Sequence, residues 1–218
     1  MNIAILIIAY NNYTHVKDMV EQVSKYTHNI TIIDNASTFE RLLKYYEEEY
    51  KYKLIRMPMN YGHNVWLRPE IINSCSDFFV VTDPDLKLNP NLPSDFLQRM
   101  VEISREFNSE RVGFALAIDY PDFYSDTIVN GVCKTYDWEL PAWKSPVKSQ
   151  KYPDMELYRF AIDTTFCLYN KSGSGNHLRI AGDFTCIHKP WSKGWKDELA
   201  PGEFESYKSG NTSTHYWS

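Results

Sequence analysis

The sequence has no hydrophobic run long enough to cross a membrane. Its longest apolar run extends only from Ile3 to Ala9, whereas a spanning helix needs about 20 apolar residues. No basic segment precedes this run, and no small-residue cleavage pattern follows it. We therefore expect the run to form a buried strand and not a signal peptide.

A surplus of positive charge is also lacking, because 23 Lys and Arg face 28 Asp and Glu. A protein that wraps a nucleic-acid backbone needs a basic surface, so we expect no nucleic-acid partner. The four cysteines form no CxxC pair and no HExxH segment is present, which leaves no zinc signature. The 9 glycines and 11 prolines are too few for a low-complexity chain.

What the sequence has is enough length for one sizeable core, with 218 residues of which 43% are hydrophobic. The run from Ile3 to Ala9 is rich in β-branched residues, which is typical of a strand buried on both faces of a parallel sheet. Further strands are predicted at 30–33, 52–56 and 78–82, and helices at 16–26, 39–50, 66–74 and 95–107. This alternation predicts an α/β fold with a mostly parallel, Rossmann-like sheet flanked by helices.

The pattern changes after about residue 100. Strands are predicted at 112–118 and 160–169, the segment Gly173–Gly175 is predicted as a hairpin turn, and most tryptophans follow residue 130. We expect residues 1–100 to form a nucleotide-binding half. Residues 101–218 are expected to shape a second pocket with a smaller mixed sheet, within one continuous domain.

Polar clusters follow three of the predicted strands, at the ends where open α/β sheets bind ligands. They are Tyr10-Asn11-Asn12, Asp34-Asn35 and Asp83-Pro84-Asp85. Two carboxylates one residue apart can converge on Mg²⁺ or Mn²⁺, which prefer oxygen ligands and leave coordination positions for water and a diphosphate. The same triplet also suits an ordinary polar turn. The triplet alone leaves both interpretations open.

In their order along the chain, these segments resemble the GT-A glycosyltransferases, particularly family-2-like sugar transferases. The resemblance rests on Ile7-Ile-Ala-Tyr-Asn, Ile33-Asp-Asn-Ala-Ser, Asn60-Tyr-Gly and Asp83-Pro-Asp. Segments 161–169 and 188–191 also resemble small glycosyltransferase domains of large algal viruses. The resemblance implies inverting transfer of a sugar from a nucleotide-diphosphate donor to a hydroxyl of a glycan or glycoprotein. It also implies Mn²⁺ or Mg²⁺ as cofactor. Because no secretory signal is evident, we expect a cytoplasmic location, in the host cytoplasm if the protein is viral.

The resemblance further implies a role for single residues in the nucleotide-sugar site. Tyr10 would pack on the base, and Asp34 would accept a hydrogen bond from it. A carboxylate suits the N3–H donor of uracil, so a UDP-sugar is the favoured donor, and a guanine or thymine base would also satisfy the carboxylate. Arg68 would lie near the phosphates or the donor sugar. The other residues assigned to this site are Ala9, Asn11, Asn60, Gly62, Asp83 and Pro84.

The metal, the base and the acceptor complete the predicted site. Asp83 and Asp85 would bind the metal, and His188 would complete its coordination shell. The family's usual Glu-Asp motif late in the chain is not evident, so the base that deprotonates the acceptor hydroxyl is sought elsewhere. Asp163 is the first candidate because it interrupts an apolar segment, and Glu139 in an aromatic segment is the second. Indole rings pack on sugar faces, and the acceptor candidates are Trp138, Trp143 and Trp191.

Every one of these residues also has a structural interpretation, as core, turn cap or salt-bridge partner. Two other functions are open as well. A non-catalytic carbohydrate-binding module would bind free glycans without nucleotide or metal. A sugar-nucleotide pyrophosphorylase needs a Gly- and Arg-rich loop after its first strand, where this chain has Tyr10-Asn-Asn-Tyr-Thr.

Overall fold

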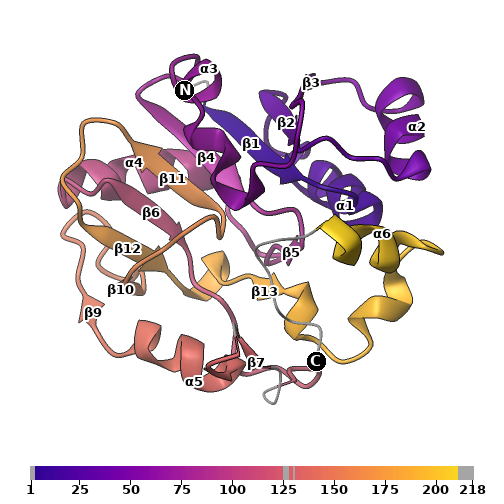
Figure 1. Ribbon diagram of the computed structural model, residues 1–218. Helices are drawn as coiled ribbons and strands as arrows, with labels where there is room; N and C mark the ends of the chain where they lie inside the picture. Colours follow the sequence, from indigo (N-terminus) through magenta and orange to yellow (C-terminus); the bar gives the residue numbers. More distant parts are fainter. Residues whose placement is uncertain (1–2, 125–127, 130, 211–218) are drawn as a thin grey trace.

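The computed structural model describes residues 3–124, 128–129 and 131–210. Its centre is a nine-stranded sheet with the order β3-β2-β1-β4-β11-β6-β12-β10-β9, against which the helices lie (Figure 1). The strands of this sheet are β1 (Ala4–Ala9), β2 (Ile30–Asp34), β3 (Lys53–Arg56), β4 (Phe78–Thr82), β6 (Arg111–Phe114), β9 (Pro146–Val147), β10 (Leu157–Arg159), β11 (Cys167–Asn170) and β12 (His177–Ile180). Within the described ranges, no helix combines the length and hydrophobicity that a membrane span requires.

The first half of the sheet is parallel: β1 pairs with β2 and β4, and β3 lies beyond β2. β1 is apolar throughout because both of its faces are covered. Ile5 and Ile7 belong to the core that includes the helices α1, α2 and α4, whereas Leu6 and Ile8 belong to a second core with η1 and α3. The helices are α1 (Tyr13–Val23), α2 (Glu40–Glu48), α3 (Pro69–Ile72), α4 (Phe96–Glu106), α5 (Thr135–Glu139) and α6 (Glu203–Gly210), with the 3-10 helices η1 (Gly62–Leu67), η2 (Leu140–Trp143), η3 (Gly182–Phe184), η4 (Lys189–Trp191) and η5 (Trp195–Glu198).

The second half of the chain extends the same sheet. β11 runs antiparallel between β4 and β6, β12 is parallel to β6, and β10 and β9 follow antiparallel. Two small sheets are separate: β5 (Leu86–Lys87) with β13 (Ile187–His188), and β7 (Ile128–Val129) with β8 (Cys133–Lys134). The predicted α/β class is confirmed, and the small sheets are antiparallel rather than mixed.

Several predicted elements differ from the structure in their bounds. The helix predicted at 66–74 is the 3-10 helix η1 followed by the short α3, because Pro69 cannot continue a helix but suits the first turn of a new one. The strand predicted at 160–169 begins only at Cys167, and the strand predicted at 112–118 is β6, which ends at Phe114. The first helix covers Tyr13–Val23 instead of 16–26.

The prediction of a hairpin turn at Gly173–Gly175 was wrong. β6 lies between β11 and β12, so the segment joins two strands that do not pair with each other. Gly173 is needed for a different reason, since a Cβ atom there would lie 2.4 Å from the carbonyl oxygen of Ser109. The segment therefore passes directly over the neighbouring backbone, which only glycine permits.

Candidate active site

The sheet topology brings the polar loops to one edge. β1, β2 and β4 are parallel, so the loops after them lie together. β11 runs antiparallel to β4, and its first residue, Cys167, pairs with Val81. The loop that precedes β11 therefore lies at the same edge. The backbone N–H of Asp83 donates to the carbonyl of Thr164 at 3.0 Å. The loop carrying Asp163 therefore faces the DxD triplet.

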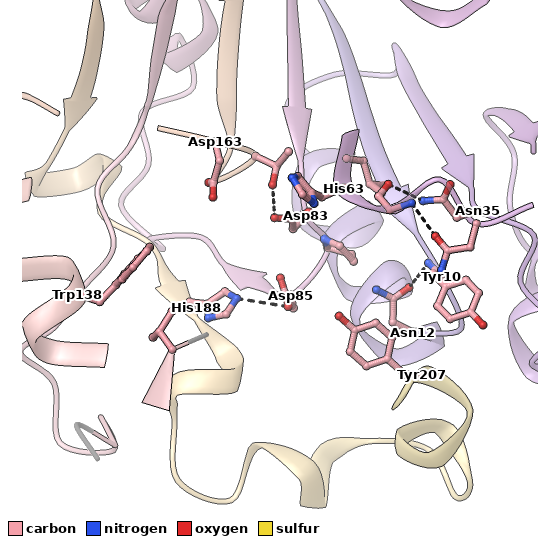
Figure 2. Close-up of a pocket in the computed structure, with 16 residues that line it drawn as sticks. Tyr10, Asn12, Asn35, His63, Asp83, Asp85, Trp138, Asp163, His188 and Tyr207 are labelled. Carbon is pink, nitrogen blue, oxygen red and sulfur yellow. Dashed lines mark hydrogen bonds and ion pairs between the residues drawn. The ribbon is translucent and has the colours of Figure 1, made fainter. Parts of the chain in front are cut away.

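A pocket of about 280 Å³ lies at this edge. Figure 2 shows aspartates in its middle, Tyr10 and Tyr207 on one side and Trp138 on the other. The predicted site residues that line it are Tyr10, Asn60, Gly62, Asp83, Pro84, Asp85, Trp138, Asp163 and His188. Lining residues to which the sequence assigned no role are Ile8, Asn12, Asn35, His63, Val129, Thr164 and Tyr207.

The two aspartates of the triplet differ in their electrostatics. Burial and the nearby charges of Asp85 and Asp163 raise the pKa of Asp83 well above its usual value, although Thr164 donates a hydrogen bond to Oδ2. Burial is the largest single influence on the pKa of Asp85 and pushes it in the same direction, but His188, His15 and a backbone hydrogen bond together outweigh burial and lower that pKa. Asp85 is therefore the charged member of the pair, and Asp83 binds a proton more readily.

The small sheet β5–β13 places His188 beside Asp85. His188 pairs with Leu86 in the register, and Nε2 of His188 lies 3.4 Å from Oδ2 of Asp85. The other oxygen, Oδ1 of Asp85, is buried without a hydrogen-bond partner in the described part of the chain. A buried carboxylate oxygen needs a partner, and a divalent cation is one that suits it.

No group of three or more His, Cys, Asp or Glu side chains in the described ranges is arranged to hold a metal on its own. The donor set nevertheless has the chemistry of a phosphate-linked metal site. Mg²⁺ at such sites commonly binds one or two carboxylates together with substrate phosphates and water. Asp83 and Asp85 supply oxygen donors that face the pocket, and the unpartnered Oδ1 of Asp85 fits this type of binding.

The side of the pocket near Tyr10 is closed by α6. Oδ1 of Asn12 accepts a hydrogen bond from the Tyr10 backbone at 3.1 Å, and Nδ2 of Asn60 donates to the carbonyl of Gly210 at 3.0 Å. The start of α6 is fixed by Glu203, which accepts hydrogen bonds from the backbone and hydroxyl of Thr14. Helix α6 thereby brings Tyr207 into the pocket wall.

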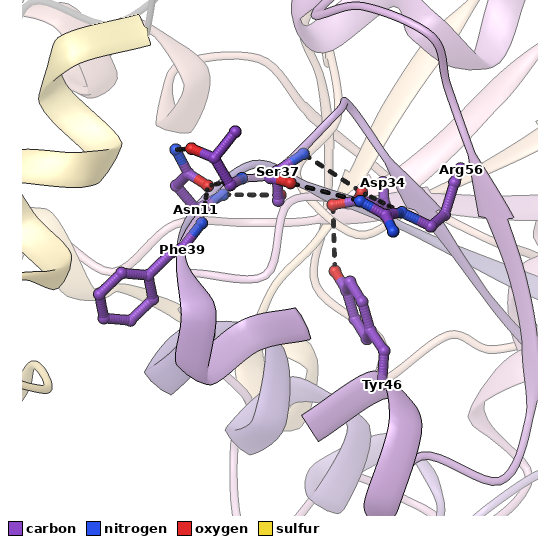
Figure 3. Close-up of polar contacts among 7 residues, drawn as sticks. Asn11, Asp34, Ser37, Phe39, Tyr46 and Arg56 are labelled. Carbon is purple, nitrogen blue, oxygen red and sulfur yellow. Dashed lines mark hydrogen bonds and ion pairs between the residues drawn. The ribbon is translucent and has the colours of Figure 1, made fainter. Parts of the chain in front are cut away.

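Asp34 and Asn11 form a buried network of polar contacts (Figure 3). Asp34 accepts hydrogen bonds from the Ser37 backbone, the Tyr46 hydroxyl and Arg56, at 3.2–3.4 Å. Asn11 has a φ of 51° and its Oδ1 accepts from two backbone N–H groups of the next loop. Both side chains bind protein groups in this conformation and do not line the pocket.

Ala9 and Arg68 are also absent from the pocket lining. Ala9 is buried at the end of β1. Arg68 is exposed, pairs with Glu70 at 3.2 Å and lies 4.6 Å from the centroid of the Tyr61 ring. The structure therefore places Arg68 in a surface cluster next to η1.

The three tryptophans predicted for the acceptor are not equivalent. Trp138 in α5 is 45% exposed and lines the pocket. Trp191 is buried and packs edge-on against His188 at 4.8 Å, and Trp143 packs edge-on against Tyr158 at 5.3 Å. Trp138 is thus the tryptophan that the fold presents to a ligand.

The two candidate bases lie in opposite surroundings. Asp163 is exposed in the pocket, so the expectation that it would be buried in a strand was wrong: that segment becomes extended only at Cys167. Glu139 belongs to α5, is buried and pairs with Arg179, so its placement in an open aromatic loop was also wrong. Arg179 also donates to the carbonyl of Ala161, which ties α5 to the loop carrying Asp163.

Glu139→Gln is expected to remove a pH dependence of stability. Burial raises the pKa of Glu139 from 4.5 to about 7, although Arg179 pulls it the other way. Folding of the wild type therefore takes up a proton between these values, and its free energy of unfolding falls as the pH rises through them. Denaturant unfolding of both proteins should show the wild type losing stability relative to the variant from about pH 5 to 7 and levelling off above. A pH-independent difference would contradict this.

Asn12 and Asn35 belong to the polar clusters that the sequence places at strand ends, but they received no role of their own there, although they stand next to the assigned Asn11 and Asp34. Thr164 likewise follows the assigned Asp163. Tyr207 had no such signal. Its place in the pocket depends on how α6 folds back over the first strand.

Comparison with known proteins finds no matching family model and no matching curated protein. Among solved structures, GalNAc-T7 with UDP, GalNAc and Mn²⁺ is similar over 86% of this chain and 44% of its own, with 11% identity and a TM-score of 0.56. A mannosyltransferase from Pyrobaculum calidifontis with GDP-Man and Mn²⁺ matches 53% of this chain and 36% of its own, with 16% identity and a TM-score of 0.43. S. aureus TarS matches 78% and 47%, with 13% identity and a TM-score of 0.46. This chain thus spans less than half the length of each. The likeness to GalNAc-T7 shows that the chain has a GT-A type α/β fold.

Proposed function

We propose that the protein is a metal-dependent glycosyltransferase that moves a sugar from a nucleotide diphosphate to a hydroxyl group. One observation carries this proposal. Asp83, Asp85 and Asp163 gather in a pocket at the carboxyl edge of the sheet, with tyrosines on one side and Trp138 on the other. The GT-A type fold supports it, since GalNAc-T7 was solved with UDP, GalNAc and Mn²⁺. Both halves of the chain contribute to the pocket, residues 1–100 mainly to the donor side.

The donor is proposed to lie with its base near Tyr10 and Tyr207 and its diphosphate toward the aspartates. Aromatic rings offer stacking faces, and Asn12 and Asn60 add polar groups on this side. A UDP-sugar is the favoured donor because the resemblance to family-2-like enzymes implies that Asp34 binds the nucleotide's uracil. With Asp34 bound to its three protein partners, base stacking is the recognition that the present conformation supports.

Mn²⁺ or Mg²⁺ would be held by Asp85 and Asp83, with His188 as the further candidate ligand. When bound, such an ion stabilises negative charge on the leaving diphosphate as a Lewis acid. The chain's own contribution is the orientation of the carboxylates. His188 holds Oδ2 of Asp85, and Thr164 holds Oδ2 of Asp83.

Asp163 is proposed as the general base. It faces the pocket, and its Oδ1 accepts a hydrogen bond from the Thr165 hydroxyl at 3.0 Å, which limits its rotation. In the reaction the acceptor hydroxyl loses its proton to Asp163 as its oxygen bonds to the anomeric carbon. The bond from that carbon to the diphosphate breaks, and the nucleoside diphosphate leaves. Trp138 would hold the acceptor sugar. Attack on the face opposite to the diphosphate inverts the configuration at the anomeric carbon.

Calorimetric titration with UDP, GDP and dTDP, each with and without Mn²⁺, tests the function directly. Binding of UDP that requires Mn²⁺ is expected. Preference for GDP or dTDP would replace the donor class but keep the transferase. Folded protein that binds no nucleotide under any condition would overturn the proposal. Binding of free glycans alone would favour a carbohydrate-binding module.

A further inference from the structure

His15 is a buried histidine that the proposed mechanism does not yet use. It lies in α1, is 4% exposed, and neither ring nitrogen has a hydrogen-bond partner among the residues that the structure describes. The ring of Trp195 stacks on it with centroids 6.1 Å apart. A buried imidazole without partners is costly, so its retention in the core calls for a further group that binds it.

The face of α1 that carries His15 packs on the two strands beside the aspartates. His15, Asp18 and Gln22 are spaced three and four residues apart, which puts them on one face of the helix. Asp18 pairs with Lys189, the residue after His188. Gln22 binds the strand after Asp85, donating to the carbonyl of Leu86 at 3.1 Å and accepting from the Leu88 backbone at 2.7 Å. His15 is therefore directed toward the same two strands.

Oδ1 of Asp85 is a further buried atom that has no hydrogen-bond partner among the described residues. The two groups act on each other electrostatically. Burial lowers the pKa of His15 to about 4, and Asp85, the next largest influence, raises that pKa. His15 in turn lowers the pKa of Asp85. A neutral imidazole has one N–H donor and one acceptor, and a carboxylate oxygen accepts more than one hydrogen bond. Buried waters typically join such otherwise unsatisfied groups.

We propose that His15 is a positioning residue that holds Asp85 through one buried water. The water accepts a hydrogen bond from the His15 ring N–H and donates one to Oδ1 of Asp85. His188 holds the other oxygen, so the carboxylate is fixed from both ends, and the second lone pair of Oδ1 is left for the metal. The inference rests on the proposed function, because Asp85 needs a fixed orientation only if it binds the metal. Outer partners of this kind orient metal ligands and tune affinity.

Mn²⁺ affinity measured by electron paramagnetic resonance of free Mn²⁺, with saturating UDP, tests the proposal. His15→Phe keeps a ring of similar size but removes both nitrogens, and we expect it to weaken Mn²⁺ binding about 10- to 100-fold. Its thermal midpoint should stay close to that of the wild type, because the phenyl ring fills the same space in the core. The matched variant His15→Gln keeps a donor and should stay within about threefold of the wild type.

The outcomes separate the two proposals. If the wild type binds Mn²⁺ with UDP and folded His15→Phe binds it equally well, the role of His15 is overturned while the transferase stands. If the wild type binds no Mn²⁺ with UDP, both proposals fail. A high-resolution crystal structure of the wild type decides independently of variant folding. A water within hydrogen-bond distance of His15 and Oδ1 of Asp85 supports the proposal, and its absence overturns it.

Discussion

Asp85→Asn is expected to abolish Mn²⁺-dependent binding of UDP, with a loss of affinity of at least about 100-fold. Loss of a residue that only hydrogen-bonds to a metal ligand typically costs about 10- to 100-fold in metal affinity, and loss of a charged ligand itself should cost more. Asn has the same shape but no charge, and its nitrogen cannot bind a cation. Asp85 is the charged member of the triplet, since His188 lowers its pKa. Asp83 compensates poorly, because burial and neighbouring carboxylates raise its pKa. Titration calorimetry of UDP with and without Mn²⁺ measures the effect.

Asp77→Asn is the matched control for this experiment. Asp77 stands just before β4, at the end of the strand opposite to the triplet, so the substitution removes the same charge away from the pocket. It should leave Mn²⁺-dependent UDP binding unchanged. Circular dichroism of both variants establishes that they are folded. Equal UDP binding by Asp85→Asn and the wild type would remove Asp85 from the metal site.

Asp163→Asn should leave donor binding nearly intact and slow sugar transfer by a factor of about 100 or more, which is the usual contribution of a general base. The side chain is exposed in the pocket and is held by the Thr165 hydroxyl, so the isosteric amide should fit without disturbing the core. A factor of 100 corresponds to about 2.7 kcal/mol of transition-state stabilisation. Single-turnover transfer from a UDP-sugar that the wild type accepts, followed at saturating donor, gives the rate.

The pH profile distinguishes a base from a merely structural aspartate. A limb of the wild-type kcat/KM profile that disappears in Asp163→Asn would identify a general base, whereas a structural aspartate would leave the shape of the profile unchanged. Donor affinity from calorimetry provides the control that the pocket is intact. A variant with full activity and an unchanged pH profile would exclude Asp163. Glu139 is a weak replacement, because Arg179 binds it in the core away from the pocket.

The order of the elements around the pocket followed from the sequence. The apolar run that forms β1 and the strand β4 with its bounds at Phe78–Thr82 were predicted, because a continuous β-branched run has few alternatives to a strand buried on both faces. Asp83 and Asp85 were placed at a strand end by position alone, and parallel strands gather such ends at one edge. Local sequence therefore determined the parallel half of the sheet and its polar loops.

Tertiary structure decided which of the marked residues face a ligand. Asp34 and Asn11 stand at the correct strand ends, yet long-range partners such as Tyr46 and Ser206 bind their side chains. Sequence spacing carries no information about such partners. The same holds for the tryptophans: Trp138 is exposed in the pocket and the other two pack on neighbours, which their positions in the sequence do not indicate.

Contacts between distant segments of the chain place the residues whose position around the pocket the sequence did not reveal. Tyr207 reaches the pocket because α6 packs on the loop after β1. His15 is directed toward the strand after Asp85 because Gln22, on the same face of α1, hydrogen-bonds to that strand. The loop that carries Asp163 lies beside Asp83 because β11 pairs antiparallel with β4. The sequence by itself determined the strands and the chemistry of their ends. Only the pairing of β11 and the packing of α1 and α6 decided the site, because these contacts join residues far apart along the chain.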